Sequence, residues 1–354
     1  MATTTMDPQP LQRVDGLWFE DGNLVLQAEN TQYRVYHGLL AASSPVFKDM
    51  MGLPRPPDSE LVEGCPFVQL HDSAAETTVF LRAIFYASSF PPFPIQADFR
   101  TVSGCLRLGH KYQVDLLRRR ALIHLSSVFD TQLERWDRIT ILRAQADSGT
   151  PPALDSVVSI LQWTPSTWSS ILVPAMQVAR EADALWLLPD AFYNLSIAVA
   201  ARSLSGAEVL HGVHYGGTFF KLHPQDQESF LVGHAMQYKS TTDALDFLAL
   251  PADIPGCESR EGCARTRYNA IGSSRARVQA LSSHPLSVWS PGLWNLLKNL
   301  CPTCRDALEA KHKAARQAFW DKLPEIYGLP SWEELERMKV ADIGTDLLVE
   351  NSGS

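Results

Sequence analysis

Apolar and polar positions divide the first 130 residues into short strands followed by amphipathic helices. Residues 24–26 form an apolar run between two turn signals, and residues 33 and 35 alternate with polar neighbours, which predicts two strands paired as a hairpin. A further strand over 66–70 precedes amphipathic helices predicted over 73–86, 99–112 and 115–129. This order predicts an α+β fold with a small sheet.

The helix-breaking sequence Ser43-Ser44-Pro45 interrupts the apolar segment 38–51. Ser44 can accept a hydrogen bond from a helix N-terminal amide, and Pro45 at the first helical position loses no bond by lacking an N–H. The segment therefore predicts two short helices that meet at an angle. Catalysis by Ser43 or Ser44 is not expected, because the Gly-x-Ser-x-Gly elbow of serine hydrolases is missing here.

From residue 131 onward the strand signal fades and helical spacing takes over. The pattern predicts helices over 171–188, 191–201, 203–212 and 305–323. A chain of 354 residues exceeds the usual size of one compact unit. We therefore divide it into a disordered leader (1–14), an α/β domain (15–130), a mostly helical region (131–250) and a cysteine-bearing segment with C-terminal helices (251–354).

Composition excludes several classes of function. The net charge of −8 argues against direct nucleic-acid binding, and the one dense basic run, 118–120, is expected to be a solvated helix face. No apolar run is long enough to span a bilayer, and the N-terminus lacks the pattern of a secretory signal. Six scattered cysteines then indicate a reducing cytoplasmic or nuclear compartment, with thiols free or metal-bound.

The cysteines supply the strongest chemical signal. Cys301 and Cys304 are two residues apart on a turn, and Cys257 and Cys263 could complete a tetrahedral four-thiolate site for one structural zinc. The gap of five residues between Cys257 and Cys263 is wider than usual, so His284 or His312 could replace a cysteine. Free thiols are the alternative, and a redox dithiol is less favoured because no βαβ pattern surrounds the motif.

A second group of residues, His211, His214 and His223, is also rich in metal-binding side chains. Glycines at 212, 216 and 217 interrupt the helix that would place them on one face, so these histidines are expected to be polar loop residues. We therefore expect a protein that is not an enzyme. The rival from another class is a redox or zinc enzyme that uses the cysteine segment.

The first region resembles a BTB/POZ domain, an interaction fold in which helices flank a small sheet. The resemblance is carried by residues in the family's order and spacing: Asp21, Leu24-Val25-Leu26, Val35, Leu39-Leu40-Ala41-Ala42, Ser44-Pro45-Val46-Phe47, Val68-Gln69-Leu70, and the runs 80–86 and 106–114. The whole chain is also similar to BTB proteins of mushroom-forming fungi. Those proteins share the helical region, a cysteine-bearing segment and a C-terminal motif like residues 323–335.

The resemblance implies a protein–protein interaction module that forms a homodimer and binds further protein partners. Its most concrete form is a substrate adaptor for a cullin-type ubiquitin ligase, which the apolar-x-Glu triplet Leu61-Val62-Glu63 fits loosely; a transcriptional or chromatin-associated scaffold is the alternative. Interface residues are predicted at Leu39, Leu40, Val46, Phe47, Met50, Met51, Leu61 and Glu63. One departure is that Tyr36 stands where the family usually has histidine, with His37 one position later.

Overall fold

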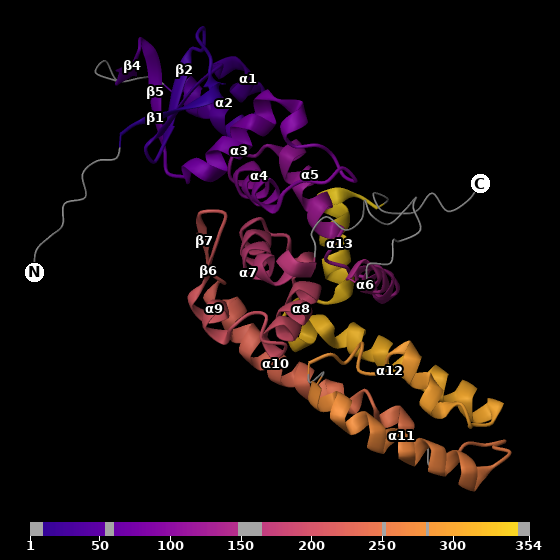
Figure 1. The fold of residues 1–354 in the computed structure, drawn as a ribbon. Coiled ribbons are helices and arrows are strands. Elements are labelled where there is room, and N and C mark those ends of the chain that lie inside the picture. The colour runs from indigo at the N-terminus through magenta and orange to yellow at the C-terminus, as the bar shows by residue number, and fades with distance from the viewer. Residues whose placement is uncertain (1–9, 54–59, 148–164, 250–252, 281–282, 346–354) are drawn as a thin grey trace, which may run out of the picture.

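A small mixed sheet lies near the N-terminus of a largely helical molecule (Figure 1). The computed structural model describes residues 10–53, 60–147, 165–249, 253–280 and 283–345. The sheet has the order β1-β3-β2-β5-β4. Its strands are β1 (Gln12–Trp18), β2 (Leu24–Ala28), β3 (Thr31–Val35), β4 (Leu61–Val62) and β5 (Cys65–Leu70).

The predicted hairpin is confirmed, because β2 and β3 pair in antiparallel register, with Leu24 opposite Val35. Strand β5 adds to β2 in parallel. The prediction of a disordered leader over 1–14 is wrong for residues 12–14, since β1 begins at Gln12 and pairs in parallel with β3. Residues 1–9 of that leader lie outside the described ranges.

The N-terminal part also contains five helices: α1 (His37–Ser43), α2 (Pro45–Gly52), α3 (Ala74–Phe85), α4 (Phe99–Lys111) and α5 (Asp115–Ser126). The capped joint between α1 and α2 is confirmed. The Ser44 hydroxyl oxygen accepts a hydrogen bond from the Phe47 N–H at 3.1 Å, and the same hydroxyl donates to the Tyr112 carbonyl at 2.5 Å. These two bonds join α1 and α2 to the end of α4. Ser44 is fully buried and has no contact with solvent.

The next region contains α6 (Leu133–Asp147), α7 (Pro165–Glu181), α8 (Leu188–Ala200), α9 (Gly206–His211), β6 (Val213–Tyr215), β7 (Thr218–Phe220) and α10 (Pro224–Asp243). The helix predicted over 171–188 corresponds to α7, which ends earlier, at Glu181, and the 3-10 turn Leu185–Leu187 separates it from α8. The β6–β7 hairpin was missed because each strand has only three residues. It turns at Gly216 and Gly217, both at positive φ, and Tyr215 meets Phe99 edge-on at 5.3 Å.

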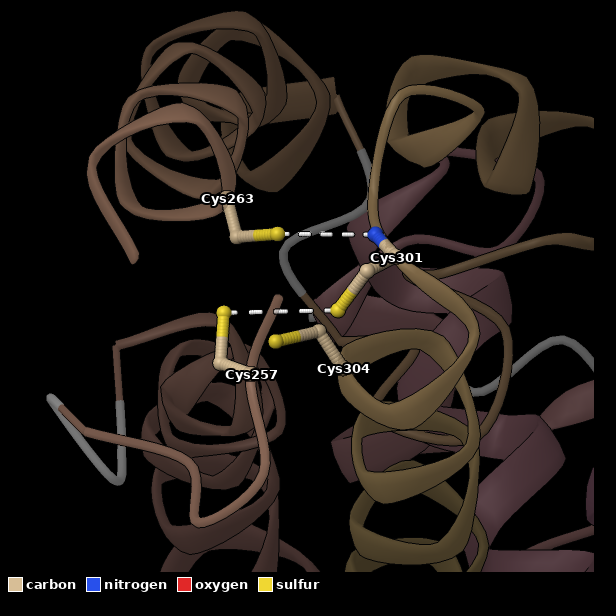
Figure 2. Close-up of side chains that lie close together, drawn as sticks. All are labelled: Cys257, Cys263, Cys301 and Cys304. Atoms are coloured by element: carbon tan, nitrogen blue, oxygen red, sulfur yellow. Dashed lines mark hydrogen bonds between the residues drawn. The ribbon is translucent and has the colours of Figure 1, made fainter. Parts of the chain in front are cut away.

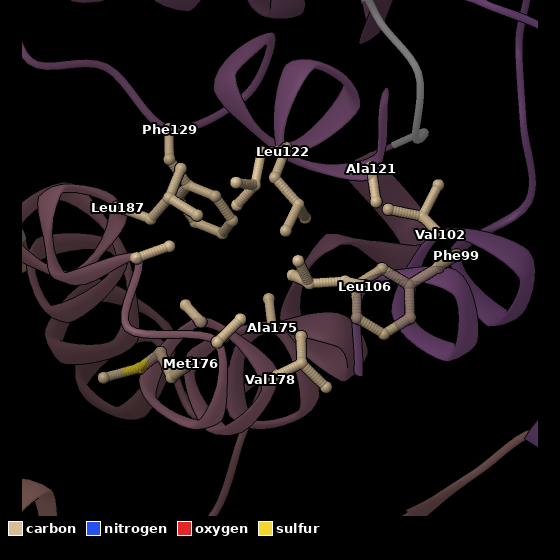
Figure 3. Close-up of a cluster of buried hydrophobic side chains, with 14 of the residues drawn as sticks. Phe99, Val102, Leu106, Ala121, Leu122, Phe129, Ala175, Met176, Val178 and Leu187 are labelled. Atoms are coloured by element: carbon tan, nitrogen blue, oxygen red, sulfur yellow. The ribbon is translucent and has the colours of Figure 1, made fainter. Parts of the chain in front are cut away.

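One continuous hydrophobic core joins the N-terminal α/β part to the helices that follow. Figure 3 shows side chains from α4 and α5 facing those of α7, among them Leu106, Leu122 and Val178. The boundary predicted between residues 130 and 131 therefore falls inside a single core. Its buried residues run from Leu17 to Ile343.

The basic run 118–120 is solvated only in part, which corrects the expectation from sequence: Arg119 is exposed, whereas Arg118 and Arg120 are half-buried, and all three side chains have partners. Arg118 forms an ion pair of 2.8 Å with Asp342, and Arg119 donates to the Ile343 carbonyl at 2.9 Å. Arg120 donates to the carbonyl of Phe90. Two of the three arginines thus fasten α5 to the C-terminal helix α13 (Trp332–Ile343).

Helices α11 (Arg260–Ala280) and α12 (Pro302–Ile326) extend side by side away from the sheet (Figure 1). They enclose a second, separate core together with the 3-10 segments η3 (Asp246–Leu248) and η4 (Pro291–Leu297). Its largest buried side chains are Phe247 and Trp289. In the described ranges, no helix has the length and apolar character that crossing a membrane requires.

Candidate metal centre and predicted interface

The four cysteines lie at the starts of α11 and α12. Cys301 is the N-cap of α12, Pro302 occupies its first position, and Cys304 follows in the first turn. Cys257 ends a turn in which its N–H donates to the Ile254 carbonyl at 3.1 Å. Cys263 lies one turn into α11, where its N–H donates to the Ser259 carbonyl at 2.8 Å.

The four sulfur atoms converge although they come from two separate stretches of chain. All four Sγ atoms lie within 4.8 Å of one another, and those of Cys257 and Cys301 are 4.0 Å apart. The Cys301 N–H also donates to the Cys263 Sγ at 3.4 Å (Figure 2). A tetrahedron with metal–sulfur bonds of about 2.3 Å has sulfur–sulfur edges of roughly 3.8 Å, so this donor set fits a zinc-sized ion.

The site has an uneven electrostatic environment. Backbone amides of Glu258 and Cys304 lower the pKa of Cys301 to about 7, because they stabilise its thiolate. Burial raises the pKa values of Cys263 and Cys304. A bound divalent ion would supply the positive charge that lets buried thiols ionise.

Aromatic side chains pack beside the cysteines in the second core. Trp289 is buried there and meets Trp294 edge-on at 5.9 Å, and Phe247 lies 5.4 Å from Trp289. His312 packs between Phe247 and Trp294, at 5.0 and 5.7 Å, and its burial lowers the pKa of the ring to about 4. Neither His312 nor His284 belongs to the sulfur cluster, so neither is needed to complete it.

The wide spacing of Cys257 and Cys263 has a simple structural reason. Gly256, at a φ of 79°, completes the turn before Cys257, and α11 begins at Arg260. One helical turn then brings Cys263 back toward the site. Gly256 and Ser259 are the sequence signals from which this turn-then-helix arrangement could have been anticipated.

The histidine group forms no metal site in the described residues. Those residues contain a single group of three or more His, Cys, Asp or Glu side chains close enough to hold an ion, which is the four cysteines. The ring nitrogen of His223 instead accepts a hydrogen bond from the Gln225 N–H at 3.3 Å and caps α10. His214 packs on Phe219 at 5.1 Å.

The structure divides the eight predicted interface residues into three groups. Leu40 and Phe47 are fully buried in the first core, so their prediction as interface residues is wrong. Val46, Met50 and Met51 are half-buried against that core. Leu39, Leu61 and Glu63 are exposed, the two leucines at 53% and 61%.

Glu63 is exposed and already paired, with ion pairs of 2.5 Å to Arg13 and 3.4 Å to Arg34. The triplet Leu61-Val62-Glu63 spans a short strand and the start of a turn. Leu61 and Val62 form β4, paired with β5, and Glu63 begins the turn between the two strands at a φ of 51°.

Tyr36 and His37 have different roles at the start of α1. The Tyr36 hydroxyl donates to an Asp21 oxygen at 2.6 Å, which raises the pKa of Tyr36, and its ring packs 4.7 Å from Phe19. The backbone N–H of His37 donates to the Asn23 side chain at 2.9 Å, while its own side chain is exposed. Tyr36 therefore connects the start of α1 to the turn before β2.

Comparison with known proteins finds no relative: no family model, curated protein or solved structure matches the chain.

Proposed function

We propose that this protein is a non-enzymatic interaction scaffold whose residues 15–130 form a BTB/POZ-type module. The observation that carries the proposal is the order of elements in that range: hairpin β2–β3, the capped pair α1–α2, strand β5 beside β2, and then α3 to α5. These elements contain the residues on which the resemblance rests. The helical remainder, which shares the core with the module, would hold the module in place and contribute partner specificity.

The contact surface of this module would include Leu39 on α1 and Leu61 on β4. Both side chains expose more than half of their surface, and burying apolar area contributes about 25 cal/mol per Å². A second copy and a cullin-type ligase scaffold are the partners that the resemblance implies. If the protein is a transcriptional scaffold, the surface around Leu39 and Leu61 would bind a different protein partner.

Aspartate substitutions at these two leucines test the proposal. Leu39→Asp and Leu61→Asp should each abolish binding to a purified cullin-type scaffold in biolayer interferometry without changing the fold. Leu116→Asp is the matched control, because Leu116 is 67% exposed on α5, a different element. Wild-type protein that binds no cullin would exclude the adaptor role. Pulldowns that return chromatin proteins instead, lost in the same variants, would favour the transcriptional scaffold.

We further propose that Cys257, Cys263, Cys301 and Cys304 hold one structural zinc ion. The convergence of four thiols supports this role, and four protein ligands leave no coordination position for a catalytic water. The ion would tie the start of α11 to the start of α12. The cysteine segment would then be a rigid support and not an active site.

Elemental analysis of the purified protein tests the zinc. We expect one zinc per chain and slow alkylation of all four cysteines. Protein free of zinc would instead support the rival redox function if Cys301 reacts fastest with an alkylating reagent and, in a separate sample treated with peroxide, forms a disulfide with Cys304.

A further inference from the structure

Helix α10 carries an exposed apolar face that the proposed module does not use. Leu231, Val232, Met236 and Tyr238 are exposed by 57, 56, 46 and 53%, and all four fall within eight residues. Exposed apolar side chains that cluster in this way mark interaction surfaces more often than isolated ones do. Figure 1 shows α10 along the margin of the molecule.

The opposite face of α10 is fixed in the first core, so the helix cannot rotate to hide these side chains. Phe230, Gly233 and Gln237 are buried, and Gly233 lies directly against the ring of Tyr327. Gln237 accepts a hydrogen bond from the Tyr327 hydroxyl at 2.7 Å and donates to the Ser283 carbonyl at 2.7 Å. The apolar face is therefore a permanent surface of the folded chain.

We propose that this face binds a second copy of the same chain, with the two α10 helices packed antiparallel about a two-fold axis between positions 233 and 234. In that register, Leu231 of each copy faces Met236 of the other, and Val232 faces Ala235. The small side chain of Ala235 lets the helices approach to the usual 8–10 Å. Such a contact is isologous, the commonest geometry of homo-oligomers.

Charge complementarity selects a second copy as the occupant. The same register places Glu228 of one chain opposite Lys239 of the other, twice per dimer. Both side chains are exposed, and in the described part of the chain neither forms an ion pair. A parallel arrangement would instead bring like charges together, so the charges fix the antiparallel direction.

One helix pair makes a small interface, so we expect a dimer that forms at micromolar concentration. Multi-angle light scattering and sedimentation equilibrium at about 10–100 µM measure it. In a Leu39→Asp background, which removes the proposed contact of the N-terminal module, Leu231→Glu should lower the weight-average mass to that of one chain, whereas Tyr268→Glu should not change it, although Tyr268 is 76% exposed on α11. An unchanged mass in a folded Leu231→Glu variant, or a wild type that is monomeric throughout, overturns the proposal.

Charge reversal separates this pairing from any other use of the face. Glu228→Lys and Lys239→Glu should each weaken the dimer on the order of tenfold, because each creates two like-charge contacts. The double variant should recover most of the wild-type affinity. A double variant as weak as the singles would exclude the antiparallel register.

Cross-linking places the axis directly. When Val232→Cys and Ala235→Cys chains are mixed, mild oxidation should form an intermolecular disulfide between residues 232 and 235, identified by peptide mass spectrometry, whereas Tyr268→Cys chains should form none. Absence of the 232–235 link contradicts the proposed axis. Leu39→Asp, which tests the N-terminal module, should leave this link intact, so failure of one proposal is distinguishable from failure of the other.

Discussion

The molecule has two hydrophobic cores of very different size. The first contains buried residues from Leu17 to Ile343 and unites the sheet with α3 to α5, α7, α8 and α13. The second has ten buried residues between Phe247 and Leu308, and two of them are Cys263 and Cys304. Small cores rarely stabilise a fold alone and usually need a cross-link or a metal. The comparison indicates that the second core depends on its sulfur cluster, whereas the first is self-sufficient.

Removing the proposed zinc ion should have the largest effect and should act on the second core alone. Structural zinc sites contribute roughly 10–16 kcal/mol of binding free energy, which is lost when the metal is chelated. We expect a strong chelator, or Cys304→Ser, to abolish hydrogen-exchange protection over 253–308 while the sheet and α3 to α5 stay protected.

The matched control is Cys105→Ser, since Cys105 is buried in the first core and lies outside the sulfur cluster. This variant should retain one zinc per chain. Unchanged protection over 253–308 after complete removal of zinc would refute the dependence of the second core on metal.

Gly233→Ala should be the most damaging small substitution in the first core. An added Cβ would lie 2.2 Å from Tyr327 Cε1, and that ring is fully buried and stacked on Phe192 at 4.6 Å. Overpacking of this kind costs about 1–3 kcal/mol, and sometimes more. Urea unfolding followed by circular dichroism measures the loss.

Gly38→Ala on α1 is the control for Gly233→Ala, because nothing lies within 4 Å of the added Cβ there. It should be neutral or slightly stabilising through helix propensity. Equal stabilities of the two variants would show that α10 can shift to make room for the added methyl group. The first core would then be less tightly packed than the structure indicates.

Asp342→Ala tests whether the first core truly extends to the C-terminal helix. Asp342 accepts hydrogen bonds from Arg118 and from the indole N–H of fully buried Trp186, both at 2.8 Å. Losing this acceptor leaves two donors unpaired, which costs about 2–3 kcal/mol.

The loss should appear in urea unfolding and as faster hydrogen exchange in α13. Arg337→Ala, at an exposed position of the same helix, should have little effect. If α13 exchanged equally fast in both variants, the ion pair between α5 and α13 would be incidental to the core.

Glu63→Ala should have the smallest effect. Its ion pair with Arg13 joins side chains that are 51% and 42% exposed, and such pairs contribute about 0.2–1 kcal/mol. A double-mutant cycle with Arg13→Ala measures the coupling, which should weaken further at high salt. A coupling above that range would mean that surface pairs stabilise the sheet edge as much as core contacts do.

Local features, such as helix caps and strands, were predictable where residues close in sequence determine them. Ser44 and Pro45 specify a cap, and alternation over 31–35 specifies a strand. The grouping of Cys257, Cys263, Cys301 and Cys304 was predicted from residue type and approximate spacing. The β6–β7 hairpin escaped prediction because strands of three residues carry almost no periodic signal.

Long-range placement was not predictable, since a helix pattern gives an apolar face but not its neighbour. Leu40 and Phe47 were expected at an interface and are buried. Arg118 and Arg119 were expected only to face solvent; both bind α13, whose residues lie more than 200 positions away, although Arg119 also stays exposed.

The sequence by itself determined the β2–β3 hairpin, the α1–α2 joint and the residues able to bind a metal, because each depends on nearby residues. Only the tertiary structure decided that residues on either side of position 130 share one core, that four sulfurs meet at two helix starts, and that α10 keeps an apolar face exposed. These features depend on which faces meet, and the packing of the whole chain decides that.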